Sequence, residues 1–309
     1  MNLENSGRRN VRDLQASLAG YFLQLGEGKR LPSIRELSSS TQMSVGAIST
    51  ALRGLQDMGA VDIQRRGHMG SYLTRISVSR LWNLLGQGPL VIALTLPMHR
   101  RFEGLATGLK IGFEKAGMEA YLIFIRGSRT RLKALHDNRC HAVVMSGLAA
   151  GELTGQENEV LLSLPPTTWL SGYSVFYRNQ PPEPGRPLRV AVDPQSHDHC
   201  MLTDLEFAGQ DVETRSVSFI QISQLLKRGE IDAIVWNTEQ VEDFLGPGIS
   251  YRPLADRVMA LAGQKSVSAV FVGRKGDYVV RAVLRACIDP VEIMEIQKKV
   301  VDGEMIPEY

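Results

Sequence analysis

Apolar side chains at helical spacing, separated by short polar breaks, fill the first 60 residues. Intervals of three or four positions separate Leu14, Leu18, Phe22 and Leu25, and two glycines then close the run. This period is typical of one apolar face on an α-helix, and glycine commonly follows a helix end. The pattern therefore predicts a first amphipathic helix up to Leu25.

Two further helices are predicted from the residues that begin them. Ser33 and Glu36 have the spacing of a capping box, so a short second helix should start at Ser33. Ser44 can cap a third helix, which should end at Gly59. The expected buried stripe of this third helix consists of Val45, Ile48, Leu52, Leu55 and Met58.

A basic hairpin is expected after the third helix. Two short runs, 60–64 and 71–74, have the alternation of strands, and glycines 67 and 70 permit a turn between them. The tip carries Arg65, Arg66 and His68. Three helices and such a hairpin form a winged helix-turn-helix, which we expect over residues 1–76.

Residues 77–88 are expected to link this module to the rest of the chain. A short helix is predicted by Leu81, Trp82, Leu84 and Leu85, and the Gly-Gln-Gly-Pro sequence after it is a breaker. An apolar cluster on so short a helix is either a surface on which domains dock or part of a subunit contact. Both interpretations fit the pattern.

Residues 89–309 alternate between apolar strands and helical patterns. Continuous Val, Ile and Leu strands with helices between them indicate parallel sheets that are covered on both faces. A proline-rich break at 181–185 divides the pattern into two α/β units, and the last strand and helices are long enough to return to the first. The expected strands are 89–96, 120–125, 142–145, 174–177, 188–192, 215–219, 233–236 and 268–272.

The charge distribution supports two modules with different partners. The whole chain has a formal charge of +2, but residues 1–80 carry eleven basic and six acidic side chains, a net of +5. The remainder carries 24 basic and 27 acidic side chains, a net of −3. A basic small module suggests a polyanionic partner, and the mildly acidic large module suggests a partner of another kind.

Composition narrows the class of protein further. With 43% hydrophobic and 22% charged residues, the chain is typical of a globular protein. The three cysteines, Cys140, Cys200 and Cys287, are odd in number and far apart, which disfavours a disulfide framework and a zinc site and fits a reducing compartment. The N-terminus lacks an apolar signal region, and the longest apolar runs are too short to span a membrane. We expect a soluble, cytoplasmic protein without a bound metal or cofactor.

The third helix and the wing supply the candidate DNA contacts. If the apolar stripe faces the core, small polar side chains remain on the outer face, where they can reach base edges or phosphates in a major groove. Arginines of the second helix and the wing would lie against the backbone or the minor groove. The expected DNA-binding residues are Arg35, Ser44, Ser49, Thr50, Arg53, Arg65, Arg66 and His68.

This stretch resembles the GntR class of bacterial transcription regulators. The resemblance runs through Leu31-Pro32-Ser33-x-Arg35-Glu36-Leu37, the third helix, Gly59-Ala60-Val61 and the wing. It implies DNA contact by Arg35, Thr50 and Arg53. The chain departs from the class at Gly46 and Ser49, where the class commonly has arginine, so a consensus GntR operator is not implied. The wing is more similar to that of the divergent YhfZ-type regulators.

The large module resembles the type II periplasmic-binding-protein fold, which effector domains of LysR-type regulators also use. YhfZ-type regulators combine such a domain with the divergent winged helix, so the resemblance covers nearly the whole chain. It implies a domain over 89–309 with two lobes. Lobe one would comprise about 89–180 and 265–309, and lobe two about 185–260. A ligand would bind in the cleft between the lobes, at the C-terminal ends of their strands.

The loops after the predicted strands supply the candidate ligand contacts. Hydroxyls and backbone N–H groups at helix N-termini suit a carboxylate or a phosphate, and arginine at the mouth adds a bidentate partner. The spacing of His197 and His199 at the start of a helix does not suit a metal. The expected ligand-binding residues are His99, Arg100, Arg101, Ser128, Arg129, Ser146, Asp193, Ser196, His197, His199 and Asn237.

These features predict an α/β protein with an N-terminal winged helix-turn-helix, a transcription regulator rather than an enzyme. We expect a homodimer that binds double-stranded DNA and is controlled by a small anionic effector. The nucleophile-elbow, Walker and H-E-x-x-H motifs are absent from the sequence. Two alternatives are an α/β enzyme with an accessory nucleic-acid-binding module and a C-terminal dimerisation domain without a ligand.

Overall fold

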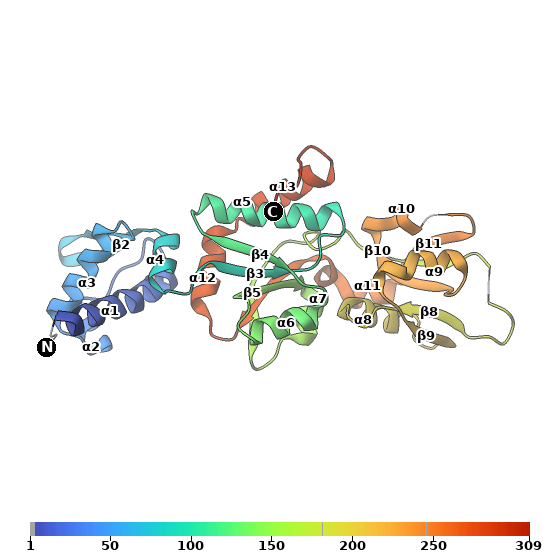
Figure 1. The fold of residues 1–309 in the computed structure, drawn as a ribbon, viewed down its shortest axis with the longest axis horizontal. Helices are drawn as coiled ribbons and strands as arrows, with labels where there is room; N and C mark the ends of the chain where they lie inside the picture. The colour runs from blue at the N-terminus through green and yellow to red at the C-terminus, as the bar shows by residue number, and fades with distance from the viewer. Residues whose placement is uncertain (1–3, 181, 245) are drawn as a thin grey trace. The chain divides into compact units, whose positions relative to one another are not determined.

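A computed structural model describes residues 4–180, 182–244 and 246–309 (Figure 1). Within these residues the chain forms two compact units. The first comprises the described residues up to Leu90 with Gly112–Ala120 and Asp277–Ile288, and the second comprises Val91–Ile111, the described residues between Tyr121 and Gly276, and Asp289–Tyr309. Segments from both sides of residue 89 share the first unit, so the expected domain boundary there stays a prediction.

The N-terminal part of the first unit has the predicted order of elements. It consists of α1 (Glu4–Leu25), α2 (Ile34–Thr41), α3 (Val45–Asp57), β1 (Val61–Arg65), the short helix η1 (Gly67–Met69) and β2 (Ser71–Ile76). The capping box is present, since Ser33 N donates to Glu36 Oε2 at 2.7 Å and Glu36 N donates to Ser33 Oγ at 3.2 Å. The strands β1 and β2 form an antiparallel hairpin. The winged helix-turn-helix is therefore confirmed in its elements.

The buried face of α3 differs from the expected stripe at both ends. Ile48, Ala51 and Leu55 are fully buried, whereas Val45 is 50% exposed and Met58 is 42% exposed. Ala51 lies one turn beyond Ile48 and takes the core position, because a helix turns by about 100° per residue and the stripe is narrower than the sequence suggested. The expectation for Val45 and Met58 was wrong.

The predicted linker helix is α4 (Val78–Leu84), and it packs against α1. Leu81 and Trp82 are buried, and Trp82 Nε1 donates to Gly88 O at 2.7 Å. The apolar cluster of residues 77–88 is thus used for packing within the chain.

The large domain contains two five-stranded sheets, which define its lobes. The sheet of lobe one has the order β4-β3-β5-β12-β6, and the sheet of lobe two has the order β11-β7-β10-β8-β9. The strands of lobe one are β3 (Leu90–Leu94), β4 (Ala120–Phe124), β5 (Ala142–Ser146), β6 (Asn158–Ser163) and β12 (Ala269–Arg274). Those of lobe two are β7 (Tyr173–Arg178), β8 (Leu188–Val192), β9 (Val212–Ser216), β10 (Ala233–Asn237) and β11 (Ile249–Pro253).

Helices connect these strands. They are α5 (Arg100–Lys115), α6 (Ser128–His136), α7 (Gly147–Leu153), α8 (His197–Glu206), α9 (Ile222–Arg228), α10 (Val241–Phe244), α11 (Asp256–Ala262), α12 (Tyr278–Cys287) and α13 (Pro290–Val301), with short 3₁₀ turns η2 (Phe219–Gln221), η3 (Thr238–Gln240) and η4 (Gly263–Val267). The mixed α/β class with a two-lobed domain is confirmed.

The sheets are mixed rather than parallel. The pairs β3–β5, β8–β9 and β8–β10 are parallel, but β7 runs antiparallel to β10 and β11, and β12 runs antiparallel to β5 and β6. The last strand returns to lobe one as expected. However, β7 belongs to the sheet of lobe two, so the expected end of the first part of lobe one at residue 180 was wrong. Two strands were missed, β6 and β11, and β9 begins three residues earlier than expected.

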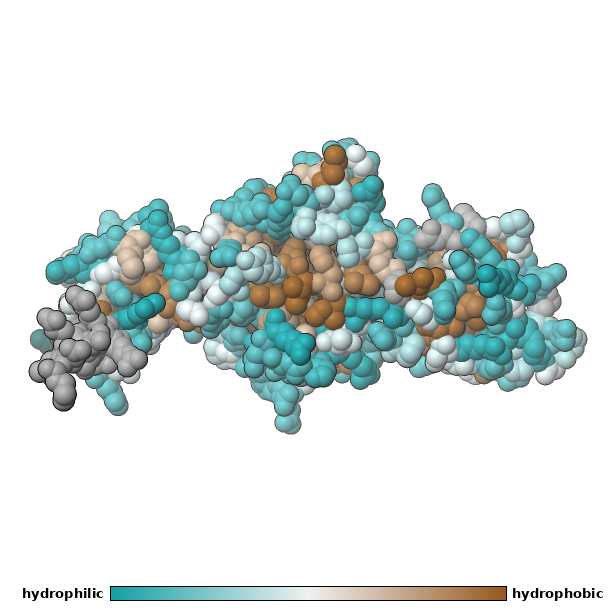
Figure 2. All heavy atoms as spheres, viewed as in Figure 1, coloured by the Kyte–Doolittle hydropathy of each residue, from teal (hydrophilic) through white to brown (hydrophobic). Residues whose placement is uncertain are grey.

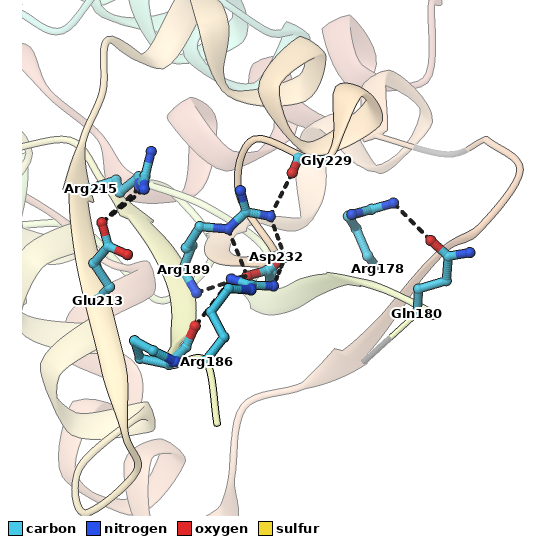
Figure 3. Close-up of polar contacts among 9 residues, drawn as sticks. Arg178, Gln180, Arg186, Arg189, Glu213, Arg215, Gly229 and Asp232 are labelled. Atoms are coloured by element: carbon cyan, nitrogen blue, oxygen red, sulfur yellow. Dashed lines mark hydrogen bonds and ion pairs between the residues drawn. The ribbon is translucent and has the colours of Figure 1, made fainter. Parts of the chain in front are cut away.

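The buried side chain of Asp232 joins the N-terminal ends of β8 and β10. The predicted ligand contacts follow the C-terminal ends of these strands. The side chain of Asp232 is 3% exposed, and Figure 3 shows Arg186 and Arg189 pointing toward it. Arg186 donates two hydrogen bonds to its oxygens, at 2.8 and 3.1 Å, and Arg189 donates two more, at 2.8 and 3.1 Å. Burial alone would raise the pKa of Asp232, but these arginines hold it well below its usual range.

We expect Asp232→Ala to lower the free energy of unfolding by about 3 kcal/mol at pH 7, because two partly buried guanidinium groups lose their carboxylate. A carboxylate whose pKa is lowered by folding stabilises the fold above its unfolded pKa of about 3.9, and this contribution is lost as pH falls from there. Urea denaturation should therefore show a smaller difference between variant and wild type at pH 3 than at pH 7. Glu213→Ala, in an exposed pair with Arg215, is the control and should change stability by about 0.5 kcal/mol or less.

Candidate functional site

The helix-turn-helix carries a set of exposed polar side chains on α2 and α3. Arg35 is the second residue of α2, and its side chain lies in solvent, as do those of Thr50 and Arg53 on α3. Ser49 is partly buried. Ser44 is exposed, but its Oγ already accepts a hydrogen bond from Ala47 N at 3.2 Å as the cap of α3.

The wing presents three exposed basic side chains, Arg65, Arg66 and His68. Arg66 Nε donates to Gln64 Oε1 at 3.1 Å, and its guanidinium lies 4.6 Å from the centre of the Tyr72 ring. These contacts hold Arg66 against the hairpin. The positive charge of Arg66 nevertheless stays on the exposed surface of the wing.

Several of these arginines have a charge that no carboxylate neutralises. Arg35, Arg53 and Arg65 make no ion pair with another residue in the described part of the chain, whereas Arg75 on β2 pairs with Asp62 at 2.8 Å. An exposed, unpaired guanidinium is available to a phosphate, which it can contact bidentately. The surface is suited to a polyanion.

A cavity of about 130 Å³ lies between the loops of the two lobes. Lobe one contributes residues that follow β3, β4 and β5, and lobe two contributes residues that follow β8 and β10. Eight of the expected ligand residues line it. They are His99, Ser128, Ser146, Asp193, Ser196, His197, His199 and Asn237.

The three arginines expected at the mouth of the cleft do not line this cavity. Arg100 is exposed and lies 3.3 Å from Glu103 on its own helix. Arg101 Nε donates to Glu239 Oε1 at 2.6 Å, a contact between the lobes, and Arg129 is exposed on α6. Neighbouring helical residues point in different directions, so only some members of such a run can face one cavity.

Two other arginines line the cavity, Arg126 and Arg131. Arg131 is 3% exposed, and its Nη1 donates to Ile125 O at 2.8 Å. Its Nε has no hydrogen-bond partner among the described residues. Burial lowers the pKa of Arg131 to about 10, while the charge of Asp198 acts in the opposite direction. Arg131 follows Ser128 by three positions, and this spacing could have placed both on one face of the predicted helix.

The N-terminus of α6 lies in the cavity wall beside these groups. Gly127 precedes the helix and provides no side-chain cap. The Ser128 side chain is buried, and its Oγ has no hydrogen-bond partner in the described structure. Unpaired backbone N–H groups, a free hydroxyl and a buried guanidinium together form a surface that an anionic group can satisfy.

Contacts between the lobes engage several other cleft residues. Ser146 Oγ donates to Asp198 Oδ1 at 2.7 Å and accepts from Ala149 N at 2.9 Å. Tyr173 donates to the other oxygen of Asp198 at 3.2 Å, and Arg126 pairs with Asp193. Burial raises the pKa of Asp198 although the two hydroxyls act in the opposite direction. Ser146 and Asp193 therefore join the lobes as well as line the cavity.

Aromatic rings and neutral imidazoles form the remaining walls. The His99 ring lies 4.1 Å from Phe102, which lies 4.7 Å from Trp169, and His199 meets Trp236 edge-on at 5.2 Å. Burial lowers the pKa of both His99 and His199 to about 4. Both nitrogens of His99 lack a partner among the described residues. Neutral imidazoles can serve as donors or acceptors to a bound molecule.

Neither a metal cluster nor a membrane span is found in the described residues. No three His, Cys, Asp or Glu side chains in this part of the chain are placed to hold a metal ion. None of the described helices is both long and apolar enough to cross a bilayer.

Comparison with known proteins agrees with this two-part architecture. A family model described as the YhfZ C-terminal domain matches residues 77–309. The chain belongs to the YhfZ family. A second model, described as a helix-turn-helix domain, matches residues 26–73. Membership of the GntR class stays a prediction, since the N-terminal match is to this other helix-turn-helix family.

One relative of this YhfZ family member matches almost its whole length, and two solved structures match about three quarters of it. The chain is 34% identical to YhfZ of Escherichia coli strain K12 over 294 residues, which cover 95% of each chain. A crystal structure of YhfZ from Shigella flexneri is 30% identical and has a TM-score of 0.61, covering 75% of this chain and 98% of that one. The periplasmic VFT2 domain of BvgS from Bordetella pertussis is 13% identical, with a TM-score of 0.50, and covers 72% of this chain and 96% of that one. The last similarity concerns the fold alone.

We expect His99→Leu to weaken the acid sensitivity of this YhfZ family member. The pKa of His99 is about 4 in the folded chain, below its unfolded value of about 6.5. Stability therefore falls as pH drops from 6.5 to 4, because only the unfolded chain takes up the proton, and the loss reaches about 3 kcal/mol. Removing two unpartnered buried nitrogens should also stabilise the variant at pH 7.

Urea denaturation between pH 8 and pH 4.5 measures both effects. Phe102→Leu is the matched control, since it removes the ring that contacts His99 without removing a titrating group. An unchanged pH slope in His99→Leu would contradict the assignment of a neutral, desolvated imidazole.

Proposed function

We propose that this chain is a transcription regulator that binds double-stranded DNA through its winged helix-turn-helix and a small anionic effector through its cleft. The observation that carries the DNA part is the set of exposed arginines on α2, α3 and the wing that make no ion pair within the described part of the chain. The observation that supports the effector is the buried, unpartnered pair of Ser128 Oγ and Arg131 Nε.

On DNA, α3 occupies the major groove. Ser49, Thr50 and Arg53 face the base edges or nearby phosphates, Arg35 contacts the backbone, and the wing follows the adjacent minor groove. The arginines supply most of the affinity, because each neutralised phosphate releases counterions from the DNA. This arrangement accounts for the +5 net charge of residues 1–80.

In the cleft, the anionic group of the effector accepts hydrogen bonds from Ser128, Arg131 and the first N–H groups of α6. The cavity of about 130 Å³ is smaller than the roughly 300–1,000 Å³ of pockets for drug-sized ligands, which favours a small metabolite. His99 and His197 have ring nitrogens left to recognise its polar substituents. The charges of Arg126 and Asp193 are already paired with each other.

The regulator acts as a homodimer in the cytoplasm, where its DNA lies. Paired half-sites multiply the affinity that one recognition helix can provide. In Figure 2, hydrophobic residues gather over the first sheet of the large domain, whose edge strand β4 carries Tyr121 at 54% exposure. An apolar edge strand is suited to pairing with another chain. Effector binding changes lobe closure and thereby the spacing of the winged helices.

A second candidate is a C-terminal dimerisation domain that needs no ligand. The contacts of Arg126 with Asp193, Ser146 with Asp198 and Arg101 with Glu239 favour it, since they join the lobes with the chain's own side chains. Ser128 Oγ and Arg131 Nε, which have no partner among the described residues, favour the effector instead, because buried donors without partners cost free energy unless a ligand satisfies them.

The DNA part is tested by replacing Arg35, Arg53 and Arg66 together with alanine. We expect the slope of log affinity against log salt concentration to become shallower by about three, with weaker binding to DNA from upstream of the gene. Gel-shift titrations at several salt concentrations measure both. The control replaces Arg139, Arg215 and Arg228 of the large domain and should bind as wild type does. Equal binding by the two triple variants would exclude this DNA surface.

The effector part is tested by thermal unfolding of the full chain against a panel of small carboxylates and phosphate esters. We expect at least one compound to raise the melting temperature of the wild type and to lose this effect in Ser128→Ala, since ligand binding stabilises the folded state by mass action. Ser163→Ala on β6, outside the cavity, should respond as wild type does. If every active compound stabilised Ser128→Ala equally, the anion subsite would be wrong, and an inactive panel would favour the ligand-free domain.

A further inference from the structure

The first turn of α3 has an apolar, small-residue surface in solvent. Val45, the first residue of the helix, is 50% exposed although its sequence pattern placed it in the core. Gly46 follows it and is exposed. Half of the Val45 side chain thus stays in water, and burying this half against another molecule would be favourable.

Gly46 is not required by the fold of the protein. Its backbone is not in the left-handed region, and a Cβ added there would meet only Ser44 Oγ, at 4.0 Å. Gly54 in the same helix is different, because a Cβ there would clash with Gln15 Nε2. Glycine lowers helix stability relative to alanine, so Gly46 weakens α3 without a benefit to packing.

The unpaired charges on α2 and farther along α3 indicate which kind of molecule covers this turn. Arg35 and Arg53 are exposed, and neither makes an ion pair within the described residues. An exposed apolar turn on a helix that also carries an unpaired arginine suits the major groove of DNA, where phosphates border base edges that include the thymine methyl group. The first residues of a recognition helix are those that reach base edges.

We propose that Val45 contacts the C5-methyl group of a thymine and that Gly46 lets the first turn of α3 come close to the base edges. This inference rests on the proposed DNA-binding function and adds its source of specificity. The chain recognises its site through apolar contact and close approach, in place of an arginine–guanine pair at this turn. Each half-site then contains an A·T pair beneath Val45.

The thymine contact is tested with DNA that the full-length chain selects from a random pool. Each thymine of the selected site is replaced singly by uracil, which lacks only the methyl group. We expect one position in each half-site to lose about fourfold in affinity, the value of burying one methyl-sized group. Val45→Ala should bind the thymine and uracil versions of that position equally, whereas the wild type distinguishes them.

The close approach is tested with Gly46→Ala. We expect its melting temperature to equal or exceed that of the wild type, because alanine favours the helix, and its affinity for the selected DNA to fall about tenfold, because the added methyl group meets the base edges. Gly151→Ala is the matched control, since Gly151 is also helical, exposed and free of neighbours within 4 Å. It should bind DNA as wild type does.

The outcomes separate this inference from the proposed function. Failure of the wild type to select any DNA would refute the DNA-binding function itself. Selection of a site at which no uracil position depends on Val45, or unchanged affinity of Gly46→Ala, would leave DNA binding in place and overturn this inference. A uracil-sensitive position that disappears in Val45→Ala, together with weaker binding by a stable Gly46→Ala, would support it.

Discussion

The buried carboxylate of Asp198 is the constraint on which the cleft depends. It lies on α8 of lobe two, and it accepts hydrogen bonds from Ser146 of lobe one and Tyr173 of lobe two. A carboxylate out of water is costly unless it is hydrogen-bonded, so the bond from Ser146 stabilises this arrangement of the two lobes. The contacts of Arg126 with Asp193 and of Arg101 with Glu239 add to this junction. The described contacts between the lobes thus include three polar pairs, of Ser146 with Asp198, Arg126 with Asp193 and Arg101 with Glu239.

The same cleft keeps other polar groups without partners. In lobe one, Ser128 Oγ and Arg131 Nε are buried and have no hydrogen-bond partner among the described residues. The His99 ring packs against Phe102, and its burial lowers its pKa so that the imidazole is neutral at pH 7. Such groups destabilise a closed, empty cleft, whereas the Asp198 contacts stabilise it. In the proposed function, a ligand that satisfies the unused donors stabilises the closed arrangement of the lobes and shifts the population toward it.

Local signals made much of the fold predictable, and distant contacts explain what was missed. The capping box of Ser33 and Glu36 and the glycine after α1 act within a few residues, so their helices were placed well. The direction of β12 is set by a partner more than 100 residues away, which periodicity does not report. Arg101 was predicted as a ligand contact, but it is paired with Glu239 of the other lobe, and the sequence does not indicate a contact over 138 residues. Arg131 was missed because arginine is rarely buried.

The coupling free energy that the proposed regulation requires is similar to the free energy that hydrogen bonds to the ligand can supply. A tenfold change in operator occupancy needs a coupling free energy of about 1.4 kcal/mol. One hydrogen bond between a charged group and its ligand contributes about 1.5–3 kcal/mol. The unused donors of Ser128 and Arg131 can therefore supply the whole coupling if the ligand reaches them only in the closed form. In DNA binding, the unpaired arginines contribute binding free energy for any DNA sequence. A modest change in the placement of α3 therefore affects mainly the smaller contribution from contacts to base edges, which depends on sequence. In the proposed function, the sequence-specific contacts are thus the ones that the effector disturbs.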